Sequence, residues 1–359
     1  MAESLLVSNP DILFMILSLL PAEALLRVKS VCRSWARVIS DPAFARAHSS
    51  RPTPVTSFFT MRLDLGENQI QGFKPFQQGS KFPTSISGIL SSGFKAVSSS
   101  YGLLCFRRDW VFIVGNPATS HWYVVQGAPP NSPFIFHGAV LIYDPAVSTH
   151  FKLAVVLVIL DDCEPFKHYM WFKIYSSETS SWAVSSLFIQ HWDPKVVSID
   201  GGRIRGSEIY KACKIGRGSI CWIDDFESLV GYEISTDTYW NVLTPPCPGS
   251  SGKDSWVLEG EGHSEELPRF VDSPFQYDSA RGALIVGGRD NGEYFALHLL
   301  SSRLEILSRG AEFQPPPWEV FDFPVVPHAN TLAPINGAKI GLNVLAREFR
   351  RLGLAPLDL

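Results

Sequence analysis

The chain has 359 residues, a formal net charge of −4 and a sequence pI near 6.1, so its charge gives no basis for binding nucleic acid or an anionic membrane. Hydrophobic residues make up 45% and charged residues 18%, which supplies a sizeable core and argues against extensive disorder. The longest aliphatic run, residues 153–160, is far shorter than the roughly 20 residues of a membrane span. With six cysteines and no C-x-x-C pair, we expect a reduced, soluble, intracellular protein of the cytoplasm, the nucleus or both.

Residues 9–48 read as a set of short helices. Asn9 is expected to cap the first helix, with Pro10 at its first position and Asp11 near the positive helix end. Between Asp11 and Pro21 the only polar position is Ser18. Apolar residues on every side of a helix indicate burial on more than one side.

The later part of this segment contains two shorter helical patterns and a last turn that begins at Asp41-Pro42. About forty residues cannot build a stable core without help. Two solutions stay open at this point: the helices dock on the rest of the same chain, or a partner protein receives them in a groove.

The segment resembles an F-box, whose usual run is L-P-x-D-[LI]-L-x-x-I-L-x-x-L-P, then L-L-R, V-C-[RK]-x-W, I and D-P-x-F. The matching positions are Asp11, Ile12, Leu13, Ile16, Leu17, Leu20, Pro21, Leu25, Leu26, Arg27, Val31, Cys32, Arg33, Trp35, Ile39, Asp41, Pro42 and Phe44. The opening Leu-Pro departs from the pattern, because Ser8-Asn9 stands there and the proline has moved to Pro10.

The resemblance implies docking on a Skp-family adaptor and, through it, on a cullin-based ubiquitin ligase. The residues it places in or around the adaptor contact are Pro10, Leu13, Ile16, Leu17, Leu20, Pro21, Leu25, Leu26, Val31, Cys32 and Trp35. Trp35 is the first candidate for a place inside the helical bundle instead.

Beyond residue 97 a unit of short strands and turns repeats. The last strand of each unit opens near Trp122, Trp182, Trp240 and Leu304, at spacings of 60, 58 and 64 residues. A period near sixty, built of β runs and turns, predicts a propeller with one antiparallel sheet per period and aromatic side chains packed between neighbouring blades. Six blades are favoured, and five or seven stay open.

The same stretches resemble the F-box-associated, kelch-related propeller region found in many plant F-box proteins. The residues that carry this resemblance are Gly102-Leu103-Leu104-Cys105, Asn116-Pro117-Ala118-Thr119, Tyr143-Asp144-Pro145 with Phe151-Lys152, and the stretch 175–182, together with Gly-Gly pairs at 201–202 and 287–288. The expected fold is mainly β with a small all-α N-terminal module. Its parts are the F-box helices (1–48), a linker with first irregular strands (49–96), the kelch-like propeller (97–345) and a C-terminal tail (346–359).

No stretch of the sequence matches a catalytic, cofactor-binding or metal-binding motif at all of its required positions. The stretches 201–206 and 248–255 miss the required positions of glycine-rich phosphate loops, and Cys163 with His168 reads as part of a solvated loop. A Ser-His-Asp triad assembled across a propeller channel stays open. Arg107, Arg108 and Trp110 are interpreted as a charged hairpin tip, with partner binding as the alternative.

The leading hypothesis is a non-catalytic substrate-recognition subunit of an SCF-type cullin ubiquitin ligase. Its helices would hold the adaptor, and its propeller would hold an unidentified target protein. The alternative is a propeller enzyme or carbohydrate-binding propeller with a structural helical cap. A third hypothesis keeps the adaptor contact without degradation.

Overall fold

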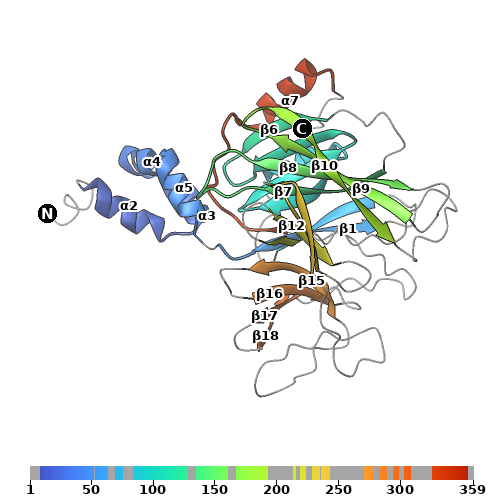
Figure 1. The fold of residues 1–359 in the computed structure, drawn as a ribbon. Coiled ribbons are helices and arrows are strands. Elements are labelled where there is room, and N and C mark those ends of the chain that lie inside the picture. Colours follow the sequence, from blue (N-terminus) through green and yellow to red (C-terminus); the bar gives the residue numbers. More distant parts are fainter. Residues whose placement is uncertain are drawn as a thin grey trace.

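Four short helices stand beside a ring of β-sheets in the computed structural model of the chain (Figure 1). The structure describes residues 9–51, 53–63, 69–75, 84–127, 135–160, 167–192, 213–215, 219–223, 229–234, 236–242, 271–278, 281, 283–288, 294–298, 303–308 and 326–354. Within these ranges, no helix has the length and apolar character needed to cross a membrane.

Prolines stand at the starts of the first and last of these four helices and between the first two. The helices are α2 (Pro10–Ser18), α3 (Ala22–Val28), α4 (Arg33–Ser40) and α5 (Pro42–Ser49). Pro21 holds extended backbone between the first two helices. The Oδ1 atom of Asp41 accepts a hydrogen bond from the backbone N of Ala43 at 2.7 Å, and Pro42 follows at the first helical position. The predicted start at Asp41-Pro42 is confirmed, although α5 is longer than the single turn expected.

The described strands form five antiparallel sheets. Two come from the middle of the chain and are described most fully. In sequence order their strands are β3 (Lys95–Ser100), β4 (Leu103–Arg108), β5 (Val111–Asn116) and β6 (His121–Gln126), then β7 (Ile135–Ile142), β8 (Lys152–Leu160), β9 (Lys167–Ser176) and β10 (Ser181–Trp192). Each group of four forms consecutive hairpins, so the local repeat of strand and turn predicted from the sequence is confirmed.

Two further sheets repeat the same four-strand order. Their strands are β11 (Cys213–Ile215), β12 (Ser219–Ile223), β13 (Leu229–Glu233) and β14 (Thr238–Val242), then β15 (Val271–Asp278), β16 (Ala283–Gly288), β17 (Tyr294–His298) and β18 (Arg303–Ser308). The landmarks of the predicted repeat fall in the last strand of each of the four sheets: Trp122 in β6, Trp182 in β10, Trp240 in β14 and Leu304 in β18. Each period of about sixty residues therefore corresponds to one four-strand unit of a sheet.

The fifth sheet combines strands from both ends of the sequence. It has the order β19-β1-β2, where β1 is Ser57–Leu63, β2 is Gln69–Pro75 and β19 is Val326–His328. Ser57 pairs with His328, and Phe59 with Val326. Because this pairing joins the start of the β region to its end, it closes the ring of sheets.

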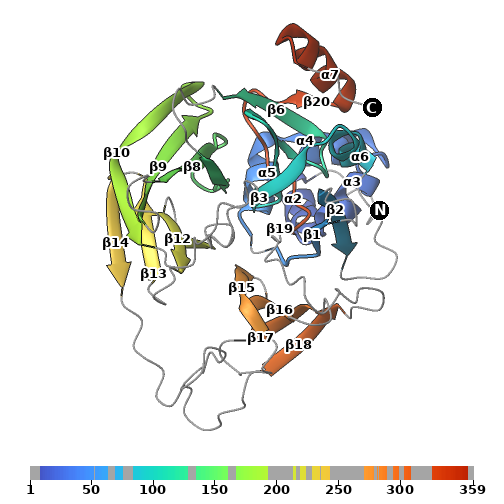
Figure 2. The same cartoon turned by 90° about the vertical axis from the view of Figure 1, so that its right-hand side faces the viewer.

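The sheets surround a common centre like the blades of a propeller (Figure 2). First strands of adjacent sheets lie side by side, β3 next to β7 and β11 next to β15, while β19 neighbours β3. Five sheets in the described residues is the lower end of the predicted five to seven, not the favoured six. The two irregular ends of the β region share one sheet instead of building one each.

The stretch after β19 adds a strand and a helix to the outside of the ring. Strand β20 (Lys339–Ile340) pairs with β6, and α7 (Leu342–Arg351) packs on both. Phe349 of α7 is fully buried and meets the ring of Phe94 edge-on at 5.6 Å. The helix crosses residue 345, where the sequence analysis ended the propeller. Helix α6 (Thr84–Ser91) likewise lies within the segment expected as a linker.

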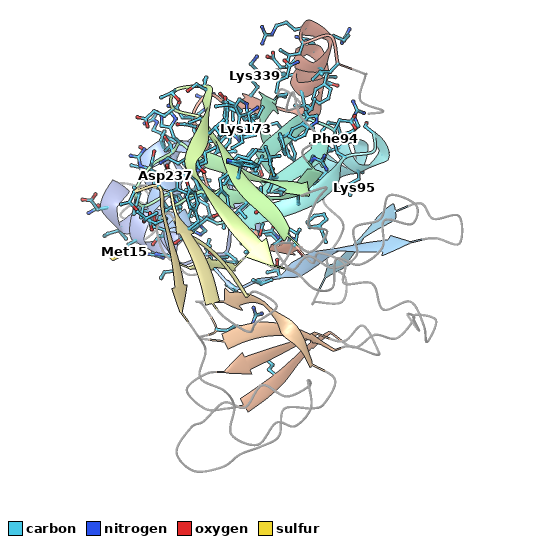
Figure 3. The ribbon with its side chains drawn as sticks, turned by 45° about the vertical axis from the view of Figure 1, so that its right-hand side comes forward. Met15, Phe94, Lys95, Lys173, Asp237 and Lys339 are labelled. Carbon is cyan, nitrogen blue, oxygen red and sulfur yellow. The ribbon has the colours of Figure 1, made fainter. Side chains whose placement is uncertain are left out.

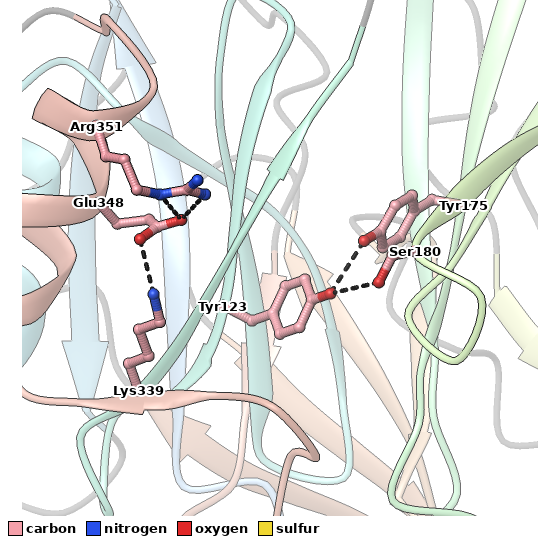
Figure 4. Close-up of polar contacts among 6 residues, drawn as sticks. All are labelled: Tyr123, Tyr175, Ser180, Lys339, Glu348 and Arg351. Carbon is pink, nitrogen blue, oxygen red and sulfur yellow. Dashed lines mark hydrogen bonds and ion pairs between the residues drawn. The ribbon is translucent and has the colours of Figure 1, made fainter.

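Aromatic side chains fill the junction between the β3–β6 sheet and the β7–β10 sheet. The ring of Trp182 lies 6.2 Å from that of Phe112, and its Nε1 donates to the carbonyl of Gln126 at 3.1 Å. The hydroxyl of Tyr123 is 3.1 Å from that of Tyr175 (Figure 4). At this junction, the prediction that aromatics pack between blades is confirmed.

Candidate functional site

Helix α2 begins as the sequence predicts. The Oδ1 atom of Asn9 accepts hydrogen bonds from the backbone N of Asp11 at 3.0 Å and of Ile12 at 3.4 Å. Pro10 opens the helix, and Asp11 places a negative charge in the first turn, near the positive helix end. The start of the helix is therefore fixed by its own residues.

One side of α2 is buried in the core of the helical bundle. Leu17 is fully buried and Leu13 nearly so. The bundle core consists of Leu13, Leu17, Ala22, Leu25, Ile39, Phe44 and Leu332. All of these except Leu332 come from the helices themselves. Leu332 follows β19, so the rest of the chain supplies part of this core.

The other side of α2 is apolar and exposed. Its residues are Ile12, Met15, Ile16 and Leu19, which follow the i, i+3, i+4, i+7 spacing of one helix face. Met15 is 63% exposed and Leu19 76%, and Figure 3 shows Met15 at the outer side of the bundle. We call these four residues the α2 face. A continuous apolar stripe in water is characteristic of an interaction surface.

The C-terminal end of α2 is held by side chains at the end of α5 and beyond. His48 Nε2 lies 2.8 Å from the Leu20 carbonyl. Arg51 donates to the Ser18 carbonyl and, at 3.1 Å, to the Ser18 hydroxyl. These groups satisfy carbonyls that a helix end leaves without intrahelical partners.

Burial lowers the pKa of His48, and the nearby charge of Arg51 lowers it further, although the hydrogen bond to Leu20 opposes both effects. The imidazole is therefore neutral near pH 7, with a proton on Nε2 to donate to the carbonyl. Asn9 thus fixes where α2 starts, and His48 with Arg51 hold its C-terminal end against the end of α5.

The eleven residues that the sequence analysis assigned to the adaptor contact differ in how far the structure buries their side chains. Those buried inside the bundle are Leu13, Leu17 and Leu25; those half-buried are Leu20, Leu26, Cys32 and Trp35; those exposed are Ile16, Pro21 and Val31. Pro10 opens α2, and its side chain lies outside the described part. Leu13, Leu17 and Leu25 point into the bundle core in this conformation, so they shape the helices instead of facing outward.

Sequence reasoning left Met15 and Leu19 out of the contact set, although they are the most exposed large apolar residues of α2. The only sign of their role in the sequence was that the helix is apolar on all sides. Periodicity alone does not say which side the chain buries by itself. Phe14 lies at the border between the two sides, because its ring meets Phe44 edge-on at 5.0 Å while remaining 36% exposed.

The basic and aromatic stretch at residues 107–110 forms the hairpin tip between β4 and β5. Arg107 Nε donates to the carbonyl of Asp109 at 2.7 Å, and its guanidinium lies 6.0 Å from the ring of Trp110. Arg108 donates to the Ser92 carbonyl at 2.7 Å. These contacts agree with the interpretation of a charged hairpin tip.

Three other patterns from the sequence lie outside the described residues: 201–206, 248–255 and the loop that contains Cys163. His168 is described only as a backbone position in β9. Within the part of the chain that the structure describes, no three His, Cys, Asp or Glu side chains gather to hold a metal ion.

Residues 10–49 match the family model described as F-box-like. The matched range covers α2 to α5, so the bundle that presents the α2 face is an F-box-like domain. The chain is also similar to two F-box proteins of Arabidopsis thaliana.

The first of these relatives, At1g49990, is 26% identical over 53% of this chain and 51% of its own length. The second, At5g18160, is 24% identical over 70% of this chain and 67% of its own length. This chain therefore spans about half of the first relative. A solved structure, the WD40 domain of SCAP from fission yeast, matches with a TM-score of 0.25 and 8% identity over 74% of this chain and 53% of that chain.

Proposed function

We propose that this protein is the substrate-recognition subunit of an SCF-type cullin ubiquitin ligase. The α2 face docks on a Skp-family adaptor, and the ring of sheets binds the protein to be ubiquitinated. The subunit itself performs no catalysis. It raises the local concentration of a target beside the ubiquitin-transfer machinery.

The observation that carries this proposal is the exposed α2 face on an F-box-like domain. A helix with anchors at i, i+3, i+4 and i+7 is suited to a hydrophobic groove on a partner. Fully burying one Leu or Met side chain contributes about 1.5–3 kcal/mol. Met15 and Leu19 start from 63% and 76% exposure, so they have the most apolar surface to lose on docking.

On this proposal residues 1–48 form the adaptor-binding module, and the kelch-like propeller of residues 97–345, with the first strands in 49–96, forms the target-binding part. The helices lie on one side of the ring (Figure 1), which leaves other surfaces of the sheets for a second partner. Holding the two functions on separate parts of one chain is what a bridging subunit requires.

The test is adaptor binding by the full chain with Leu19→Asp and, separately, Met15→Asp. Each change would place an unpaired carboxylate in the buried contact, so we expect affinity for a purified Skp-family adaptor to fall about 100-fold or more. Because both side chains are exposed in the free protein, the thermal unfolding midpoint should stay close to that of the wild type. Leu17→Asp is unsuitable, since Leu17 is fully buried and the variant would disrupt the bundle itself.

Val184→Asp is the matched control, because Val184 is an apolar residue with 66% exposure in β10, a strand of the ring and not of the helical bundle. It should bind the adaptor as the wild type does. Undiminished binding by both α2 variants would remove the proposed docking surface.

A further inference from the structure

The segment that follows β19 lies between the helical bundle and the ring. We call residues 329–336 the closing segment. Side chains of this segment point to opposite sides, as in an extended strand, so that some contact the bundle and others contact the ring. Leu332 belongs to the core of the helical bundle, whereas Ala333 and Ile335 belong to the core shared by the β3–β6 and β7–β10 sheets.

Polar contacts fix the ring side of the closing segment. Asn116, at the end of β5, is fully buried, and its Nδ2 donates to the carbonyls of Thr331 at 3.0 Å and Ala333 at 3.1 Å. The hydroxyl of Tyr143 donates to the carbonyl of Pro334. Asn116 therefore anchors the segment from a position in the sheet, outside the helical bundle.

The side chain of Thr331 adds a further link to the ring. Its hydroxyl donates to the carbonyl of Tyr101 at 2.7 Å, in the turn between β3 and β4. Gly102 follows in that turn with a φ of +79°, and a Cβ there would lie 2.3 Å from Thr331 Oγ1. The segment and the turn are thus packed with no room for another atom.

The bundle side of the segment makes one apolar and one polar contact. Leu332 is 4% exposed among core residues of α2, α3 and α5 that include Leu17, Leu25 and Phe44. Asn330 Nδ2 donates to Glu23 Oε1 in α3 at 2.6 Å. Because helices this short depend on tertiary packing, a side chain that completes their core also holds their relative positions.

We propose that Leu332 is a positioning residue that couples adaptor docking to closure of the ring. The bundle holds the α2 face in its docking arrangement only while the closing segment is hydrogen-bonded to Asn116. A chain whose last sheet has not closed, or has opened, then binds the adaptor weakly. The part about the adaptor rests on the proposed function, whereas the coupling between bundle and ring does not.

The experiment uses the full chain with Leu332→Ala, Asn116→Ala and two controls. Leu332→Met keeps an apolar side chain of similar volume. Asn336→Ala changes an exposed residue of the same segment, whose amide lies 3.0 Å from His150 Nε2. Two quantities are measured: affinity for a purified Skp-family adaptor by calorimetry, and hydrogen exchange of backbone amides in α2–α5 and in β4–β5.

We expect Leu332→Ala and Asn116→Ala each to weaken adaptor binding about tenfold or more and to speed exchange in α2–α5. Leu332→Met should stay within about threefold of the wild type, since volume-conserving changes in a core are tolerated best. Asn336→Ala should match the wild type. The Asn116 variant is decisive, because Asn116 makes its contacts within the ring and to the closing segment.

Unchanged exchange in α2–α5 after Asn116→Ala would overturn the coupling, and so would wild-type adaptor affinity in Leu332→Ala. If the wild-type chain bound no Skp-family adaptor, the proposed function would fail, while the exchange measurements would still decide the coupling.

Discussion

His328 lies in β19, where the last strand closes the ring, and it is 2% exposed. Its Nε2 lies 3.2 Å from Asn330 Oδ1, and its Nδ1 is buried with no hydrogen-bond partner among the described residues. Burial lowers its pKa to about 4, although the hydrogen bond with Asn330 acts in the opposite direction. The imidazole is neutral in the folded protein, so acid should destabilise the closure.

The size of the effect follows from the difference between the folded and unfolded pKa values. An exposed histidine in the unfolded chain titrates near 6.5, so the unfolded state takes up the proton first as the pH falls. The contribution to stability is fully present above about pH 6.5 and is lost progressively between that pH and about 4. Between pH 7 and pH 5 this single group should lower the free energy of unfolding by about 2 kcal/mol.

Urea unfolding of the wild type and of His328→Gln at pH 7 and pH 5 measures this contribution. Glutamine keeps a donor for Asn330 and does not titrate. His48 and His121, whose pKa values burial also lowers, remain in both proteins, so the difference between the two pH dependences isolates His328. We expect the wild type to lose about 2 kcal/mol more than the variant. Equal losses would refute the argument that His328 is held neutral.

Two further changes test the packing and the surface charges. Gly102→Ala should lower the free energy of unfolding by about 2–4 kcal/mol in urea, because the new Cβ would combine a positive φ with a clash against Thr331 Oγ1; a loss below about 1 kcal/mol would contradict the packing described here. Glu348→Gln should cost less than about 1 kcal/mol, although Arg351 and Lys339 contact the carboxylate (Figure 4) and lower its pKa to about 2. Both cations are mostly exposed, so a larger loss in thermal unfolding would show that solvent weakens these pairs less than expected.

The starts of α2 and α5 were predictable from the sequence because capping is local. The Oδ1 atoms of Asn9 and Asp41 bond backbone N–H groups two or three residues away, and a proline follows each of them. No distant residue is needed to recognise such a signal. The sequence therefore predicts where these two helices start, whereas α4 begins after Cys32 with no side-chain cap to mark it.

The side of α2 that faces outward was not predictable in the same way. Both Leu17 and Leu19 are apolar, yet one is fully buried and the other 76% exposed. The difference depends on how α4 and α5 cross α2 and on Leu332, which joins the bundle from beyond β19. Periodicity within one helix carries no information about such a distant neighbour.

The repeat of the sheets was predictable, but their closure was not. Trp122 and Trp182 mark corresponding strands because the same four-strand unit recurs. The two-residue strand β20 and the three-residue strand β19 are too short to show an alternating pattern. Their partners β6 and β1 lie far away in the sequence, so only the folded structure reveals that the irregular ends belong together.

The pairing of β1 with β19 also has a consequence for synthesis of the protein in the cell. The roughly 250 residues between Pro75 and Val326 take roughly 10–50 s to add at about 5–20 residues per second. During that time one edge of β1 has no partner strand, and unpaired strand edges promote aggregation. The nascent chain thus passes through a long interval in which this strand edge is open to aggregation, and slower translation would lengthen the interval.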